Sequence, residues 1–402
     1  MVKVVQINSV CGVGSTGRIC AGIADVAGNS GYECKIAYGR MQAPAKFEDI
    51  SFRIESNFGV KIHALKSRLF GKSGTYSKRA TKKFLAWLDE FKPDILHLHN
   101  LHGYYINFPE LFDYIKRKGI TTVWTLHDCW AFTGHCAYFD EDKCGKWENG
   151  CYKCECKRSY PKSLRDDSAK MYALKKQCFS GVKDLHIVTP SVWLEKLVKK
   201  SFLGCYETSV INNGIDLQIF KPYDSDFKAK FHCEDKFVIL GVASVWDERK
   251  GLEVFVELSK RLDERFQIVL VGVSAELQKN LPENIVVVQR TENARQLAEI
   301  YSSADLFVNP TKQENFPTVN IEALACGTPV LTYETGGSTE IIDSTCGTSV
   351  KRNDVEGLIE KILYIYDNKP YKSSDCVARA QMYDANDKFK EYLSLYNQQS
   401  DN

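Results

Sequence analysis

The chain has 402 residues, of which 44% are hydrophobic and 26% charged, and its formal net charge is +2. These proportions are ordinary for a soluble globular protein, and the length predicts about two or three domains. The small net charge identifies no partner, and no apolar run approaches the roughly 20 residues that a membrane-spanning helix needs. The first residues, MVKVVQINSV, lack the pattern of a secretory signal. We therefore expect a cytoplasmic protein, in which the 15 cysteines are thiols or metal ligands rather than disulfides.

A glycine-rich loop follows the first predicted strand, residues 2–10, and precedes a helix predicted for 18–28. Three glycines match the pattern G-x-G-x-x-G: Gly12, Gly14 and Gly17. Such a loop lets a phosphate approach backbone N–H groups at the start of a helix. A dinucleotide site also needs an acidic residue after the second strand, but that strand, predicted for 33–38, ends in Gly39-Arg40. The missing acidic residue argues against an NAD site, and Arg40 alone leaves an NADP site as an alternative.

Residues 61–92 are predicted to be helical and are strongly basic, with nine Lys and Arg residues against Asp89 and Glu90. Apolar side chains are interleaved with these cations: Leu65, Leu69, Phe70, Phe84, Leu85, Trp87 and Leu88. Two interpretations stay open, a solvated helix face and a surface that lies on anionic lipid headgroups. Nucleic acid is not expected as a partner, because no base-stacking platform or known binding module accompanies the charges.

Histidines lie at the ends of two further predicted strands, residues 94–100 and 121–126. They are His97, His99, His102 and His127. The first three do not predict a metal site, because no carboxylate ligand pattern lies nearby. His127, followed by Asp128, lies where parallel sheets bind ligands, and an imidazole that titrates near neutrality suits such a place. A buried structural histidine is the alternative.

Cysteines crowd residues 129–160, which we expect to be an insertion. Four of them follow the pattern C-x7-C-x6-C-x2-C: Cys136, Cys144, Cys151 and Cys154. Four thiolates in one polar loop favour a tetrahedral structural zinc site, with the Cys151-x2-Cys154 pair as its most specific feature. The alternatives are thiols without metal and an iron–sulfur cluster. A zinc ion would brace the insertion and take no part in the chemistry.

Residues 305–342 have the order strand, acidic loop, helix, strand and glycine loop. Glu314 lies in the acidic loop, and Glu322 follows after seven residues on the predicted helix. In a parallel sheet such loops lie at the carboxyl ends of the strands, where ligands bind. An earlier apolar strand leads to Arg249-Lys250.

The E-x7-E spacing of Glu314 and Glu322, together with the HDCWAFTGHC segment that contains His127, resembles the retaining glycosyltransferases of family 4. The resemblance covers nearly the whole chain and implies the GT-B fold, an α/β architecture of two Rossmann-like domains with parallel sheets that face each other across a cleft. It implies an acceptor-side domain at 1–218 and a nucleotide-sugar-binding domain at 219–380. A C-terminal helix within 381–402 would pack back on the first domain.

The resemblance also implies roles for single residues. The expected catalytic residues are His127, Asp128, Glu314, Lys250 and Arg249. The expected donor-binding residues are Gly14, Ser15, Thr16, Gly17, Ser244, Asn315, Phe316, Thr318, Val319 and Glu322. Glu314 would contact hydroxyls of the donor sugar, Glu322 the ribose, and Lys250 the diphosphate. Two departures weaken the phosphate contacts, since Val245 stands where the family usually has arginine and Pro317 where glycine is common.

The activity implied by the resemblance is transfer of a hexose from a UDP- or GDP-sugar to a saccharide or lipid-linked saccharide acceptor. Retention at the anomeric carbon is expected, without a metal ion for catalysis. The setting would be cell-surface polysaccharide or glycolipid biosynthesis, at the inner face of the cell membrane if residues 61–92 bind lipid. Two alternatives stay open: a non-hydrolysing sugar-nucleotide epimerase, which needs no acceptor, and a non-catalytic, zinc-stabilised binding subunit of a polysaccharide assembly complex.

Overall fold

The computed structural model describes residues 1–139, 144–158 and 160–400. Parts of two predicted segments lie outside the described residues: 140–143 and 159 of the Cys-rich insertion, and 401–402 of the C-terminal segment.

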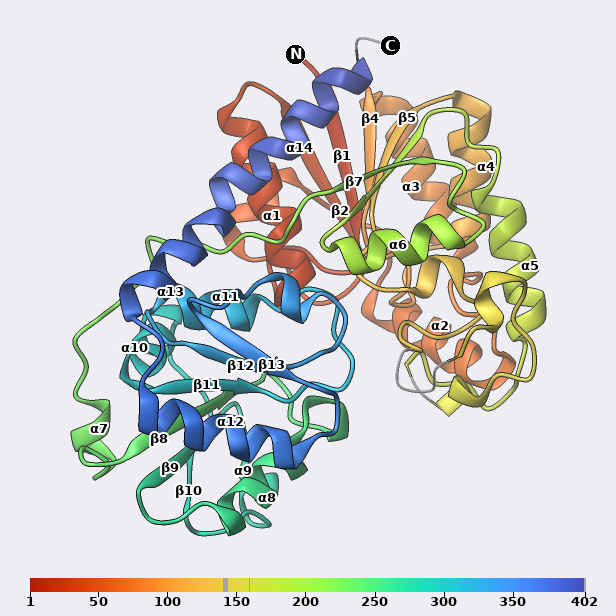
Figure 1. Cartoon of the computed structure of the whole chain (residues 1–402). Coiled ribbons are helices and arrows are strands. Elements are labelled where there is room, and N and C mark those ends of the chain that lie inside the picture. The colour runs from red at the N-terminus through yellow and green to blue at the C-terminus, as the bar shows by residue number, and fades with distance from the viewer. Residues whose placement is uncertain (140–143, 159, 401–402) are drawn as a thin grey trace. The chain divides into compact units, whose positions relative to one another are not determined.

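The chain divides into two compact units (Figure 1). The first comprises Met1–Asn212 and Asn386–Asn402, and the second comprises Asn213–Ala385. The division therefore falls a few residues before the expected one at 218/219.

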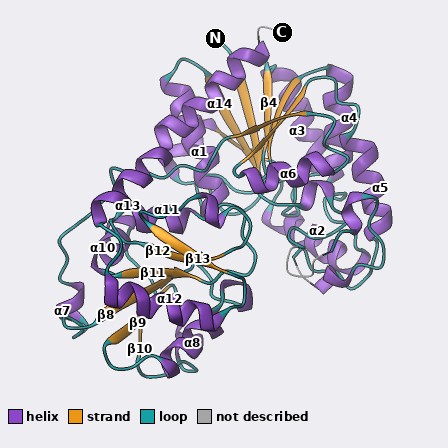
Figure 2. Ribbon diagram, viewed as in Figure 1, coloured by secondary structure: helices purple, strands orange, loops and turns teal. Residues whose placement is uncertain are grey.

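The first unit is built on a seven-stranded sheet with the order β3-β2-β1-β4-β5-β6-β7, in which all neighbouring strands are parallel (Figure 2). The strands are β1 (Lys3–Asn8), β2 (Glu33–Tyr38), β3 (Ser51–Arg53), β4 (Ile95–Leu98), β5 (Thr121–Thr125), β6 (Leu185–Thr189) and β7 (Glu207–Val210). The central strands are buried almost throughout, as expected where helices cover both faces of a parallel sheet. The strand order changes direction between β1 and β4, and such a switch point is where open α/β sheets bind ligands.

Local chemistry sets the bounds of the helices in this unit. They are α1 (Gly14–Asn29), α2 (Asn57–Phe70), α3 (Lys78–Phe91), α4 (Phe108–Lys118), α5 (Ser168–Phe179) and α6 (Val192–Lys200). The Ser191 hydroxyl caps α6 by accepting a hydrogen bond from the Leu194 N–H at 3.1 Å. The predicted start of the first helix at residue 18 is wrong, because the chain already turns into α1 at Gly14, whose φ is +66°. The end of the G-x-G-x-x-G loop therefore forms the first turn of α1.

Helices α2 and α3 contain the basic stretch and differ in what they bury. Phe84, Leu85 and Leu88 of α3 lie in the core of the first unit, so they do not belong to an exposed apolar surface. Helix α2 instead exposes five large apolar side chains: Phe58, Ile62, Leu65, Leu69 and Phe70. In the part of the chain that the structure describes, no helix combines the length and apolar character needed to cross a bilayer.

The last helix, α14 (Ala385–Ser400), returns to the first unit (Figure 1). It approaches α1 so closely that a Cβ added at Gly22 would lie 2.2 Å from the Phe389 ring. Tyr396 is fully buried, and its hydroxyl lies 2.6 Å from Nδ1 of His97 on β4. Side chains of the chain terminus are thus part of the core beside the histidine strands.

The second unit has a six-stranded parallel sheet with the order β10-β9-β8-β11-β12-β13. Its strands are β8 (Phe237–Val242), β9 (Phe266–Val271), β10 (Ile285–Val288), β11 (Leu306–Asn309), β12 (Val330–Tyr333) and β13 (Gly347–Val350). Its helices are α7 (Phe227–Lys230), α8 (Leu252–Arg261), α9 (Ala275–Gln278), α10 (Ala294–Ser303), α11 (Thr318–Ala325), α12 (Val355–Asn368) and α13 (Ser373–Ala380). The switch point lies between β8 and β11. Both sheets have the Rossmann strand order, which confirms the predicted α/β class with two Rossmann-like domains.

Candidate active site

In the second unit, the loops that follow β8 and β11 meet in an ion pair. Lys250 Nζ donates to Glu314 Oε2 at 2.7 Å, and only 19% and 15% of the two side chains are exposed. Burial alone would raise the pKa of Glu314, but the Lys250 ammonium and, more weakly, Arg249 outweigh it and lower that pKa. The Asp247 carboxylate positions Lys250 by accepting its backbone N–H at 2.9 Å. A fixed cation and a fixed carboxylate therefore lie together at the switch point.

The position usually held by arginine in the family lies in an exposed turn. Ser244 is exposed, and Val245 is 68% exposed, directly after β8. Arg249 directs its guanidinium to the acidic loop instead, where Nη1 donates to the Gln313 carbonyl at 3.1 Å. The backbone is tied at the same place, since the Lys312 N–H donates to the Arg249 carbonyl at 2.8 Å. Arg249 thus holds the loop that carries Glu314.

The glycine loop after β12 packs directly on the acidic loop. Gly336 has a φ of +54°, and a Cβ there would lie 1.8 Å from the Glu314 carbonyl oxygen. The Gly337 N–H donates to the Asn315 carbonyl at 2.7 Å. Asn315 and Phe316 are both 4% exposed. The two loops predicted from the sequence therefore pack directly against each other, and glycine is required where they touch.

Helix α11 begins directly after the acidic loop, and no side chain caps its N-terminus. Pro317 is its N-cap residue and provides no side-chain cap, while Thr318 and Val319 are half-buried in its first turn. The N-terminus of a helix carries partial positive charge, which favours phosphate. Glu322, one turn further, is 8% exposed and accepts a hydrogen bond from the Tyr301 hydroxyl at 3.2 Å. Its carboxylate is therefore already held in a defined orientation.

In the first unit, the G-x-G-x-x-G loop is closed by a hydrogen bond from the Gly12 N–H to the Gly17 carbonyl at 3.0 Å. Ser15 is exposed, Thr16 is half-buried and Gly17 is buried. No side chain caps the start of α1. This helix start at the switch point has the backbone geometry that was expected to face phosphate.

A chain of hydrogen bonds determines the protonation of His127. Gln6 Nε2 donates to the Cys20 carbonyl at 2.9 Å, so Gln6 Oε1 accepts from Nε2–H of His99 at 3.0 Å. Nδ1 of His99 must then accept from Nε2–H of His127, also at 3.0 Å. Burial lowers the pKa of His127 to about 4. The ring is neutral near pH 7, with Nδ1 as its acceptor nitrogen.

Asp128 is paired with His102. Its Oδ2 lies 2.7 Å from Nε2 of His102, and its Oδ1 accepts the Trp130 N–H at 2.8 Å. Burial raises the pKa of Asp128, but His102 outweighs burial, so the net shift is downward. Nδ1 of His102 lies 3.1 Å from the Tyr160 hydroxyl. The His127 ring donates its Nε2–H to Nδ1 of His99.

Sequence reasoning missed Gln6, His99 and His102 as parts of this arrangement. One signal was available for Gln6, since it interrupts the apolar run of the first strand and is fully buried. A buried amide needs partners. The two histidines were placed at the end of a predicted strand and a metal site was not favoured for them, but their partners, His127 and Gln6 for His99 and Asp128 for His102, lie on other parts of the sequence.

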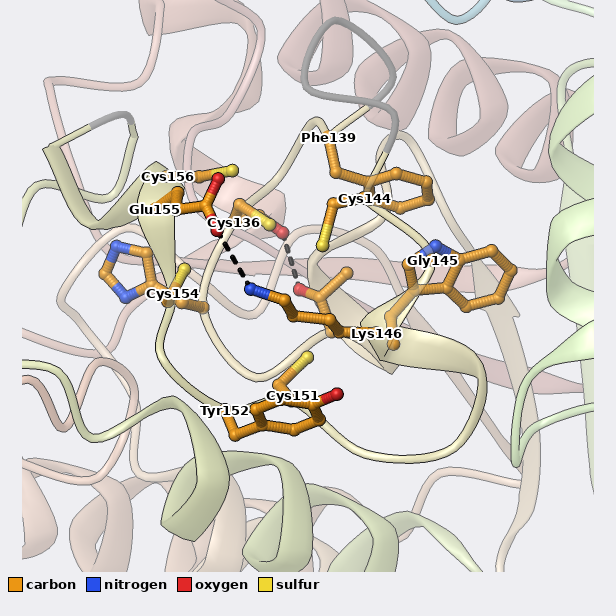
Figure 3. Close-up of a pocket in the computed structure, with 13 residues that line it drawn as sticks. Cys136, Phe139, Cys144, Gly145, Lys146, Cys151, Tyr152, Cys154, Glu155 and Cys156 are labelled. Atoms are coloured by element: carbon orange, nitrogen blue, oxygen red, sulfur yellow. Dashed lines mark hydrogen bonds and ion pairs between the residues drawn. The ribbon is translucent and has the colours of Figure 1, made fainter.

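The cysteines line a cavity of about 220 Å³ whose wall includes the end of the HDCWAFTGHC segment, and Figure 3 shows them on different sides of it. The cysteines in its wall are Cys136, Cys144, Cys151, Cys154 and Cys156. Beside it lies Lys175, which is 1% exposed and donates to the carbonyls of Trp130 and Thr133 at 2.5 and 2.9 Å. Burial lowers the pKa of Lys175 to about 7. Among the described residues, no group of three or more His, Cys, Asp or Glu side chains is arranged to hold a metal ion as it stands.

Two family models match the chain. The model described as "Glycosyltransferase Family 4" matches residues 17–219, about half of the chain, and the model described as "Glycosyl transferases group 1" matches residues 236–368. The first match lies mostly in the first structural unit, and the second lies within the second unit.

Curated relatives are glycosyltransferases by name. WcaC of Escherichia coli strain K12, named for colanic acid biosynthesis, is 26% identical over 67% of this chain and 66% of its own length. An N-acetylgalactosaminyltransferase of Campylobacter jejuni that is named for a diphospho-undecaprenol acceptor is 27% identical over 46% of this chain and 52% of its own. CapM of Staphylococcus aureus, named for capsular polysaccharide biosynthesis, is 26% identical over 38% of this chain and 43% of its own. The matches thus span between about two fifths and two thirds of these relatives.

Solved structures share the fold over the full length. Sucrose-phosphate synthase from Thermosynechococcus elongatus has a TM-score of 0.72 at 17% identity and covers 99% of both chains. HepE from Anabaena, crystallised with UDP, has a TM-score of 0.69 at 13% identity and covers 99% of this chain and 100% of its own. At these identities the structures show the fold alone. The family model that spans half of the sequence shows that the chain belongs to glycosyltransferase family 4.

Proposed function

We propose that this chain transfers a hexosyl group from a UDP- or GDP-sugar to a hydroxyl of a saccharide or lipid-linked saccharide, with retention at the anomeric carbon. The observation that carries the proposal is the Lys250–Glu314 ion pair at the switch point of the second sheet. It places a cation for phosphate and a carboxylate for sugar hydroxyls side by side. The retained configuration is inferred from the E-x7-E pattern.

The second unit supplies the groups that a nucleotide-sugar needs. The Lys250 ammonium has three N–H donors, of which one bonds to Glu314. The others are suited to the diphosphate, whose charge grows as the sugar leaves. Helix α11 presents its uncapped start beside the same loop. Glu322, already oriented by Tyr301, is proposed to bind the ribose hydroxyls.

The first unit supplies a neutral acceptor-side histidine. Because His127 donates through Nε2 to His99, its Nδ1 is the nitrogen that accepts a hydrogen bond from a sugar hydroxyl. Its lowered pKa means that it orients the hydroxyl without adding positive charge to the site. The role of His127 is therefore positioning of substrate rather than charge stabilisation.

Lipid-linked acceptors are proposed because the relative from Campylobacter jejuni and one from Escherichia coli are named for diphospho-undecaprenol substrates. The exposed surface of helix α2 is consistent with an acceptor that is held in a membrane. Phe58, Ile62, Leu65 and Leu69 recur at three- and four-residue spacing, so they form one exposed apolar stripe. Lysines line a cavity nearby: Lys66, Lys72, Lys78 and Lys170. We propose that α2 lies on an anionic bilayer, with its apolar stripe in the headgroup boundary.

The test is incubation with UDP- and GDP-hexoses, with and without undecaprenyl-diphosphate-linked saccharides. A glycosylated acceptor whose new linkage keeps the donor's anomeric configuration, read by NMR, supports the proposal. Epimerised donor without any acceptor would support the epimerase. Glu314→Gln that still folds and leaves transfer unchanged would contradict the role assigned to the ion pair.

A further inference from the structure

The Cys-rich segment encloses a cavity that opens partly to solvent. It measures about 220 Å³ and is walled by five cysteines, His135 and aromatic rings. The thiols of Cys136, Cys154 and Cys156 are near enough to hydrogen-bond to one another. Many donor atoms for a soft metal therefore surround one space.

His135 shows which nitrogen would face such a metal. Its ring is 8% exposed and hydrogen-bonds to the backbone of Lys157. Among the described residues, Nε2 of His135 is one of the few buried polar side-chain atoms without a hydrogen-bond partner. The Lys157 bond must therefore use Nδ1. A histidine that ligates a metal commonly donates its other ring N–H to a backbone carbonyl, which is this arrangement.

A hydrogen bond to the sulfur of Cys151 is a second feature that is typical of a metal ligand. Its Sγ accepts the backbone N–H of Gly134 at 3.1 Å. A thiol sulfur is a weak acceptor, whereas hydrogen bonds to a charged acceptor are shorter and stronger. The Gly134 N–H is therefore placed where it would stabilise a thiolate.

Lys175 provides the balancing charge. Its ammonium is buried against two carbonyls and the Trp130 ring, 3.6 Å from the ring centroid. A buried ammonium is costly without a negative partner, and the electrostatic neighbours of Lys175 include Cys151 and Cys136. Three thiolates around one Zn²⁺ carry a net charge of −1, which one ammonium neutralises.

We propose that this cavity binds one structural zinc ion through His135 Nε2 and the thiolates of Cys136, Cys151 and Cys154, with Lys175 as counter-charge. His135 takes the place that the sequence pattern assigned to Cys144. The three thiols lose their protons to solvent as the ion binds, and no electrons are transferred. Because the side chains do not yet converge on one point, they must rotate into the cavity. The ion would fix the segment from Trp130 to Thr133, which follows His127-Asp128.

The experiment is elemental analysis of the full chain, purified under reducing conditions without chelator. About one zinc per chain is expected. His135→Ala and Cys154→Ser should each lose it, and Cys205→Ser, at an exposed cysteine, should retain it. Cobalt exchanged into the wild-type protein should show thiolate-to-cobalt charge-transfer absorption, which needs no variant to fold. Lys175→Met should lower zinc affinity about 10- to 100-fold in chelator competition, as other outer-shell changes do.

Reduced wild-type protein with no bound zinc and with freely titrating thiols would overturn the proposal. Retention of zinc by His135→Ala combined with its loss in Cys144→Ser would overturn the ligand set. A cobalt spectrum without thiolate charge transfer would exclude the cavity as the site of any zinc found.

Discussion

Replacing Lys250 by methionine should weaken binding of a nucleoside diphosphate while leaving the second unit folded. The side chain loses its charged end group and keeps most of its unbranched length. A charge-assisted hydrogen bond contributes about 1.5–3 kcal/mol. Since about 1.4 kcal/mol corresponds to a factor of ten, loss of the ammonium–phosphate contact should raise the Kd roughly 10- to 150-fold. Isothermal titration calorimetry with UDP, and in parallel GDP, measures this change.

The same substitution should also lower stability, because it leaves the Glu314 carboxylate without its cation. Removing one partner of a fully buried pair costs about 3–5 kcal/mol. The side chains are 15–19% exposed, and Arg249 remains near, so we expect about 1–3 kcal/mol from urea unfolding. The lowered pKa of Glu314 sets the pH window. The pair stabilises the fold above the unfolded pKa of about 4.3, and this stabilisation is lost as pH falls through the lower folded pKa.

Two further variants separate binding from stability. Lys228→Met removes an ion pair of the same 2.7 Å length, to Asp305, before β11 and away from the loops. It should lower stability without changing the Kd. The double variant Lys250→Met with Glu314→Gln should recover part of the lost stability, with a coupling energy of about 0.5–3 kcal/mol. If Lys250→Met loses stability but shifts the Kd no more than Lys228→Met does, the phosphate role is wrong.

Three other outcomes are expected. The acid limb of kcat/KM should lie well below 6.5, because burial holds the pKa of His127 at about 4; a limb near 6.5 that disappears in His127→Asn would refute the neutral-ring assignment. Leu65→Ser with Leu69→Ser should reduce sedimentation with anionic vesicles severalfold, whereas Tyr364→Ser, at an exposed residue of the second unit, should not; equal binding by both would remove α2 from the contact. Gly336→Ala should destabilise the second unit by more than about 2 kcal/mol, since its Cβ would meet the Glu314 carbonyl at 1.8 Å; an unchanged urea midpoint would contradict the close packing of the two loops.

Much of the fold was predictable because its signals are local. Apolar runs that end at glycine, proline or polar clusters marked the strands. The strand predicted at 33–38 coincides with β2, and the one predicted at 121–126 is one residue longer than β5. The predicted boundary of a helix was wrong where a tertiary contact determines it. Helix α1 starts at Gly14 rather than residue 18, because the backbone of Gly12 bonds to that of Gly17. The spacing of apolar residues along the sequence gives no sign of this hydrogen bond.

The basic stretch shows a second limit. Cations and apolar residues alternate in both α2 and α3. Only packing separates them, since Phe84 and Leu88 face the core while Phe58 and Leu65 remain exposed. An amphipathic pattern predicts that one face of a helix is apolar. Only the tertiary structure determines whether that face packs in the core or stays exposed.

By itself the sequence determined the α/β class, the glycine loop, the E-x7-E pair and the cluster of cysteines, since each is a pattern of residue types at short spacing. Tertiary structure decided which of these residues act together. Gln6, His99 and His127 belong to β1 or follow β4 and β5, three neighbouring strands whose parallel register brings distant positions to one edge. Lys250 and Glu314 meet for the same reason, because β8 pairs with β11. Strand order is a property of the whole sheet, so no local pattern could assign these partners.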